Sequence, residues 1–156
     1  MISFTAATLS HSNLGGFGPD SGDQTMLISN VGSANGVGLN LQISSDAAYS
    51  VANTANNKVD NGFGEINVAP EATSVITFKW VDADGSPVTL DKFVFSFYDF
   101  DSGNDGKVTE SMTVGGYSSY VVSDNTQVAI SAASDGMTKF SATEASALMI
   151  LPCSFC

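Results

Sequence analysis

Short stretches of alternating apolar and polar residues follow one another along most of the chain. The clearest runs over residues 37–44, where Val37, Leu39, Leu41 and Ile43 alternate with glycine or polar residues. Side chains two apart in a strand lie on the same face of a sheet, so this pattern predicts a strand with one buried face. Related patterns predict strands at residues 2–9, 25–31, 65–68, 74–81, 93–97, 108–114, 117–122, 127–131, 138–143 and 148–151, with a weaker candidate at 48–54.

Glycine, asparagine and aspartate separate these stretches, and residues 13–23 and 56–64 are rich enough in them to predict loops. No long stretch keeps helical spacing; residues 144–149 are the best helical candidate and would form one or two turns. A dozen short strands punctuated by turns predict an all-β fold, with two packed antiparallel sheets in a jelly-roll-like β-sandwich. At 156 residues the chain is expected to be a single domain, residues 1–156.

Two apolar strands are expected to supply the centre of the core. Large apolar side chains two residues apart share one sheet face in strand 93–97 and in strand 74–81, and both are expected to be central strands. The expected core residues are Phe93, Phe95 and Phe97, together with Ile76, Phe78 and Trp80.

An acidic turn follows the first of these strands directly. Asp99 and Asp101 would share a face if the strand continued, and residues 102–106 supply further oxygen-bearing side chains and glycines. Calcium takes six to eight oxygen ligands, so the turn predicts a Ca²⁺ site that differs from an EF-hand in lacking flanking helices. A solvated hairpin turn is the alternative. The candidate ligands are Asp99, Asp101, Asn104, Asp105 and Glu110, with Asp20 completing the site if loop 13–23 folds over the same edge.

The charge balance narrows the choice of partner. The chain has 16 acidic and 5 basic residues, all five of them lysine, and a formal net charge of −11. Binding to nucleic acid or to an anionic membrane surface requires positive charge, so we exclude both and expect cations as small partners. No run approaches the roughly 20 apolar residues of a membrane span, which predicts no membrane insertion.

The inventory for catalysis is thin, and we expect a non-enzymatic protein. His11 is the single histidine and lies among loop-forming residues without a nucleophile-elbow pattern, so a solvated surface histidine is favoured. Glu65, Glu110 or Asp99 could form the carboxylate pair of a glycan hydrolase, but only by analogy at the level of the fold.

Two tyrosines suggest a different function. Tyr117 and Tyr120 lie beside glycine and serine residues and are candidates for exposed rings that stack on sugars, as in a lectin-like carbohydrate-binding module. Cys153 and Cys156 form a C-x-x-C pair without a second pair for zinc. A disulfide and two free thiols both remain open for them.

Three segments, residues 13–20, 61–68 and 95–101 followed by Glu110, resemble uncharacterised β-sandwich domains of secreted or surface proteins from microalgae. The resemblance implies a non-catalytic role in an extracellular or lumenal setting. Residues 1–5 lack the features of a signal peptide, which leaves two alternatives, a cytoplasmic protein or a chain whose leader is missing. The extracellular or lumenal setting is expected with the second. We therefore expect a calcium-binding structural or adhesive module that forms a homo-oligomer, a filament or part of a larger assembly.

Overall fold

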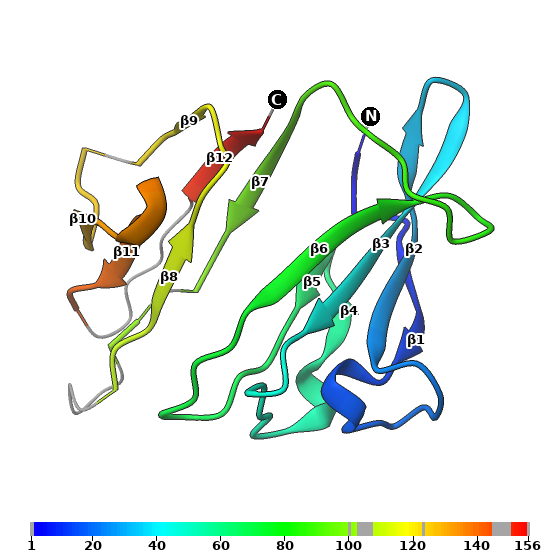
Figure 1. The fold of residues 1–156 in the computed structure, drawn as a ribbon, viewed down its shortest axis with the longest axis horizontal. Coiled ribbons are helices and arrows are strands. Elements are labelled where there is room, and N and C mark those ends of the chain that lie inside the picture. The colour runs from blue at the N-terminus through cyan, green and yellow to red at the C-terminus, as the bar shows by residue number, and fades with distance from the viewer. Residues whose placement is uncertain (1, 100, 103–107, 123, 145–150, 156) are drawn as a thin grey trace. The chain divides into compact units, whose positions relative to one another are not determined.

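The computed structural model describes residues 2–99, 101–102, 108–122, 124–144 and 151–155, the last of these by their backbone (Figure 1). Internal contacts divide the chain into two compact units, Met1–Thr89 and Leu90–Cys156. The expectation of a single domain stays a prediction.

The N-terminal unit is built on a four-stranded antiparallel sheet with the strand order β1-β2-β3-β6. Its strands are β1 (Thr8–Ser12), β2 (Thr25–Ala34), β3 (Val37–Ser45) and β6 (Ile76–Val81). The alternation predicted over residues 37–44 is confirmed, because Leu39, Leu41 and Ile43 are buried on one face of β3. β6 was expected to be central but lies at the margin of the sheet, where the Val88 N–H donates to the Trp80 carbonyl.

A short hairpin of β4 (Lys58–Asp60) and β5 (Phe63–Glu65) packs against the buried face of this sheet. Gly64 lies so close to it that an added Cβ would meet Ile28 Cδ1 at 2.9 Å. The sequence prediction of a loop over residues 56–64 was wrong here. Asn61 and Gly62 have φ of 48° and 83°, the left-handed pair that closes a two-residue hairpin. The core is made of Leu14, Met26, Ile28, Val31, Leu39, Leu41, Ile43, Tyr49, Trp80 and Val81.

A buried polar cluster holds the long connection between β3 and β6. The Tyr49 hydroxyl donates to the Asn67 carbonyl at 2.7 Å and accepts from Asn57 Nδ2 at 2.9 Å. Burial raises the pKa of the Tyr49 hydroxyl, against a lowering by Asn57. The cluster supplies hydrogen bonds to residues 46–57, which form no strand, although residues 48–54 had been a weak strand candidate.

The C-terminal unit contains two three-stranded antiparallel sheets (Figure 1). The first has the order β10-β11-β8, with β8 (Ser111–Val114), β10 (Val128–Ala132) and β11 (Thr138–Ala142). The second has the order β7-β12-β9, with β7 (Phe93–Phe97), β9 (Ser119–Tyr120) and β12 (Leu151–Phe155). The expected central position of strand 93–97 was wrong, because β12 pairs between β7 and β9 and leaves β7 at the margin.

The core of the C-terminal unit is small. Val128, Phe140 and Ala142 are buried, and Phe97, Met112 and Tyr117 are among the half-buried residues packed against them. The three phenylalanines of β7 are half-buried rather than central, with the rings of Phe95 and Phe97 stacked at 5.4 Å. They also belong to a different unit from Ile76, Phe78 and Trp80.

The prediction of a mostly β protein with antiparallel sheets is confirmed. The described residues include no helix of seven or more residues, and the helical candidate at 144–149 lies outside them except for Glu144. A search of the described helices for one long and apolar enough to cross a membrane finds none.

Candidate functional site

The acidic turn is closed at its base by the backbone of Asp101 and Glu110. The Glu110 N–H donates to the Asp101 carbonyl at 2.9 Å, and the Asp101 N–H lies 3.4 Å from Glu110 Oε2. The Glu110 carbonyl accepts from the Ala142 N–H, and the Ser102 N–H donates to the Glu144 carbonyl. Three backbone hydrogen bonds and one from backbone to side chain thus fix both arms of the turn on one another and on the chain around the end of β11.

The orientation of Asp99 differs from the one that strand alternation predicts. β7 ends at Phe97, and Asp99 has φ of 65°, in the left-handed region that few non-glycine residues adopt. The expectation that Asp99 and Asp101 share a sheet face was therefore wrong, because the strand does not continue that far. The left-handed backbone at Asp99, rather than strand alternation, therefore sets the direction of its side chain.

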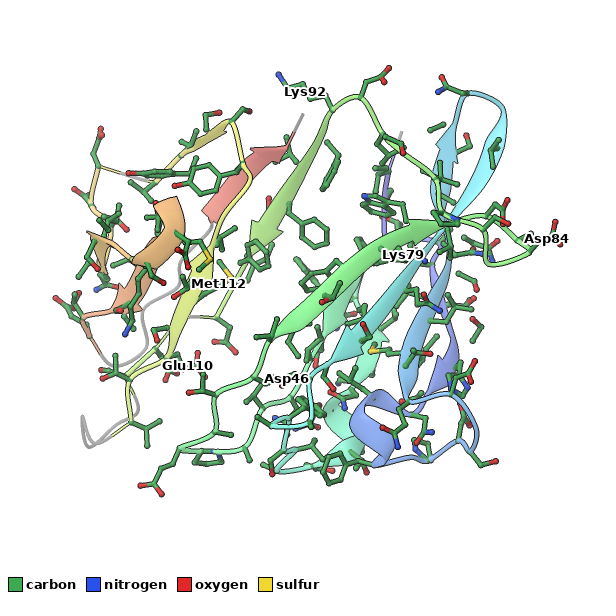
Figure 2. The ribbon with its side chains drawn as sticks, in the orientation of Figure 1. Asp46, Lys79, Asp84, Lys92, Glu110 and Met112 are labelled. Carbon is green, nitrogen blue, oxygen red and sulfur yellow. The ribbon has the colours of Figure 1, made fainter. Side chains whose placement is uncertain are left out.

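Three carboxylates gather at the base of the turn, those of Asp99, Asp101 and Glu110. Burial raises the pKa of the Glu110 carboxyl, and the charges of Asp101 and Asp99 raise it further, while the hydrogen bond from Asp101 lowers it. Glu110 is exposed over much of its surface, so solvent screening limits the size of this effect. Figure 2 shows Glu110 where the chain enters β8, ahead of Met112. The negative charges of Asp99 and Asp101 beside Glu110 favour binding of a positive charge at this place.

The described residues supply only part of a metal site. No group of three or more His, Cys, Asp or Glu side chains among them is arranged to hold a metal ion. Asn104 and Asp105, two of the expected ligands, lie outside the described residues. Asp99, Asp101 and Glu110 would need further oxygens from backbone carbonyls, water or those two side chains to reach the coordination that calcium takes.

Asp20, the remaining expected ligand, belongs to the N-terminal unit and is engaged there. Its carboxylate accepts from the Ser12 N–H at 2.7 Å and lies 3.5 Å from His11 Nδ1. Its N–H donates to the Ser12 carbonyl. Asp20 thereby fastens loop 13–24 to the outer edge of β1, and its role in a shared calcium site stays a prediction.

Sequence reasoning missed Asn13, on which this loop is organised. Its side-chain nitrogen donates to the carbonyls of Gly22 and Asp23, its oxygen accepts from the Gly18 N–H, and the residue is 5% exposed. An asparagine at the start of a glycine-rich run is the signal that could have identified it, because asparagine side chains often replace backbone partners in turns.

An open hollow of about 420 Å³ lies between this loop and the outer face of the sheet. Its lining includes His11, Asp23, Leu27 and Gln42. The His11 Nε2 atom lies 2.8 Å from the Asp23 carbonyl and must donate to it, since a carbonyl only accepts. Both ring nitrogens therefore face oxygens of the loop rather than a hydroxyl nucleophile, and His11 acts as a loop fastener.

The two candidate sugar-stacking residues have different surroundings. Tyr117 is half-buried and its hydroxyl bonds to Thr138 Oγ1, whereas Tyr120 is 37% exposed. Their rings are 5.7 Å apart at an interplanar angle of 79°, and Tyr120 also packs edge-on against Phe140. They do not form one flat platform. Of the other candidate motif, Cys153 lies in β12 and Cys156 lies outside the described residues.

Comparison with known proteins identifies no relative of this chain. No protein-family model matches the chain. Neither a curated protein nor a solved structure matches it. Any function proposed for the chain therefore rests on its own residues and on the geometry of the two units.

Proposed function

We propose that the protein is a non-enzymatic β-module of an extracellular or lumenal setting that binds Ca²⁺ through its acidic turn and assembles with copies of itself or a larger complex. Asp99, Asp101 and Glu110 are the ligands at the base of the turn, with Asn104 and Asp105 as further ligands. A two-sheet antiparallel, jelly-roll-like β-sandwich is the finer architecture that we propose with it.

The observation that carries this proposal is the closed base of the turn. Reciprocal contacts between Asp101 and Glu110 hold two acidic residues across from one another, and the charge of Asp99 lies near enough to raise the pKa of Glu110. Like charges held together by the backbone repel, and a divalent cation relieves that repulsion. A hard cation with oxygen ligands suits these groups best, and millimolar calcium is the range in which extracellular modules work.

Isothermal titration calorimetry of the full chain tests the proposal. We expect Ca²⁺ to bind with a dissociation constant on the order of 0.1–1 mM. Glu110→Gln and Asp101→Asn should each weaken binding about tenfold or more, since each removes one charged ligand. The matched control is Asp84→Asn, which removes the same charge from an exposed turn after β6 in the N-terminal unit (Figure 2).

The outcomes separate a site from general attraction to an acidic protein. Equal weakening by Asp84→Asn would indicate unspecific attraction to the net charge, and the site would be rejected. Absence of heat with Ca²⁺, together with an unchanged melting temperature, would leave the turn as a structural element only. Mg²⁺ should bind more weakly, because it demands stricter octahedral geometry.

Carbohydrate binding is a second candidate function, favoured by the exposed ring of Tyr120. A glycan array on which binding disappears in Tyr120→Ala, but not in Tyr49→Phe with its buried ring, would favour a lectin-like module. Hydrolysis of any bound glycan would instead indicate an enzyme.

A further inference from the structure

Strand β10 has one edge with which no described strand pairs. It is the first strand in the order β10-β11-β8 and pairs with β11 alone (Figure 1). Beside β10 the Thr143 N–H donates to the Gln127 carbonyl, and beyond it the Ala133 N–H donates to the Met137 carbonyl. Along a strand of an antiparallel pair, the backbone N–H and C=O groups of successive residues point alternately toward the partner strand and away from it. The two hydrogen bonds therefore determine this direction for every residue between Gln127 and Ala133.

This alternation sends the backbone groups of Ala129 and Ser131 toward β11 and those of Val128, Ile130 and Ala132 to the outer side. Within the described part of the chain, nothing pairs with that outer row. Unpaired N–H and C=O groups in a row are a template for another strand.

The β10 edge also lacks the features that normally prevent such pairing. Residues 128–132 contain no charged residue and no proline, and Ile130 is 38% exposed. Natural edges are usually protected by lysine, proline, bulges or a covering segment. Other edges of this protein have such protection: Asp20 bonds across the outer edge of β1, and Val81 forms a bridge to Pro87 beside β6.

Resting on the self-assembly in the proposed function, we propose that β10 pairs antiparallel with β10 of a second copy, with Ile130 on the two-fold axis. Val128 of one copy then lies opposite Ala132 of the other, and Ala129 lies opposite Ser131. A pair of this kind is isologous and closes at two copies, so this edge forms a dimer rather than a filament.

Charge supports a second copy as the occupant of this edge. Two chains of net charge −11 repel one another, so they can meet only where acids do not face acids. Residues 128–132 carry no charge, so an antiparallel pair of β10 strands sets no acid opposite an acid.

Sedimentation equilibrium of the full chain in EDTA tests the dimer. We expect a reversible dimer with a dissociation constant on the order of 10–100 µM, as suits a small interface. Ile130→Pro removes the outward N–H without removing a bond to β11, so dimerisation should weaken at least about tenfold while the circular-dichroism spectrum is kept. Ile130→Val is the control and should leave the dimer intact.

A charge exchange tests the register and serves if the proline variant does not fold. The double variants Ala129→Lys/Ser131→Lys and Ala129→Glu/Ser131→Glu set like charges opposite one another, so each alone should dimerise at least about tenfold more weakly. Mixing the two should restore the dimer. Dimerisation of each alone at wild-type strength would overturn the register.

A wild-type chain that stays monomeric at millimolar concentration would overturn the second copy as the occupant. Because these measurements are made without calcium, their outcome is independent of the calorimetric test of calcium binding. Loss of the β10 dimer would leave the calcium titration unchanged, and absence of calcium binding would leave the dimer unchanged.

Discussion

The two units differ in how completely each buries its own apolar residues. In the N-terminal unit Leu14, Met26, Ile28 and Val31 are fully buried beneath one four-stranded sheet. In the C-terminal unit Phe140 alone among the large described side chains is fully buried. The acidic turn and the β10 edge both lie in this second unit.

This difference indicates a division of labour between the two units. Burial of apolar surface is the main favourable term in folding. The N-terminal unit should therefore be the more stable of the two when each is considered by itself. The C-terminal unit has less to lose by reserving strand edges and carboxylates for external partners. On our proposals, calcium and a second copy supply part of the stabilisation that its own core lacks.

Cutting the chain between the units should have the largest effect. Residues 1–89 are expected to fold alone, with the dispersed amide spectrum of a β protein by nuclear magnetic resonance. Residues 90–156 form a unit of roughly 70 residues with a small core, so alone they should lose most of their structure. A well-dispersed spectrum from the isolated second fragment would contradict the comparison.

Truncating a core side chain should cost more unfolding free energy in the N-terminal unit than in the C-terminal unit. Leu41→Ala removes a side chain that is 1% exposed and should cost about 2–5 kcal/mol of unfolding free energy. Phe97→Ala removes a half-buried ring, so we expect a smaller cost of about 1–3 kcal/mol. Urea denaturation measures both. Val75→Ala, at a side chain 65% exposed, should change stability by less than about 0.5 kcal/mol.

Ionisation of Glu110 should have the smallest of these effects on folding stability. Its pKa is raised in the folded state, so the native protein binds this proton more readily than the unfolded chain. Stability from this group therefore falls as pH rises through the raised pKa, and Glu110→Gln should raise the melting temperature slightly at neutral pH in EDTA. The gain should shrink toward about pH 4, where Glu110 is protonated. A melting temperature lowered by the substitution at neutral pH would show that the charge is stabilising.

Much of the fold follows from the sequence because strand periodicity is a local signal. Residues 37–44 alternate strictly, and β3 forms where they predict it. The hairpin β4–β5 was missed because its strands are too short to alternate, although Asn61-Gly62 identifies the turn. The order of strands depends on pairings distant in sequence, which is why the central positions expected for β6 and β7 were wrong.

The candidate site was predictable in its composition but not in its geometry. The density of acids between Asp99 and Glu110 marked the turn correctly as a place of concentrated charge. The left-handed backbone of Asp99 could not be derived from alternation, because it depends on where β7 ends. The role of Asn13 could not be predicted because its side chain bonds to three backbone groups, those of Gly18, Gly22 and Asp23. Only the folded loop brings these groups within hydrogen-bonding distance.

Loop 13–24 has a consequence for dynamics that its composition conceals. Its glycines and its proline are typical of segments that exchange amide protons quickly and are cut first by proteases. Here the Gly18 amide is held by a buried asparagine and the Gly16 amide by the Asn13 carbonyl. Both protons are therefore hydrogen-bonded within the loop, and we expect them to exchange more slowly than the composition of this segment predicts.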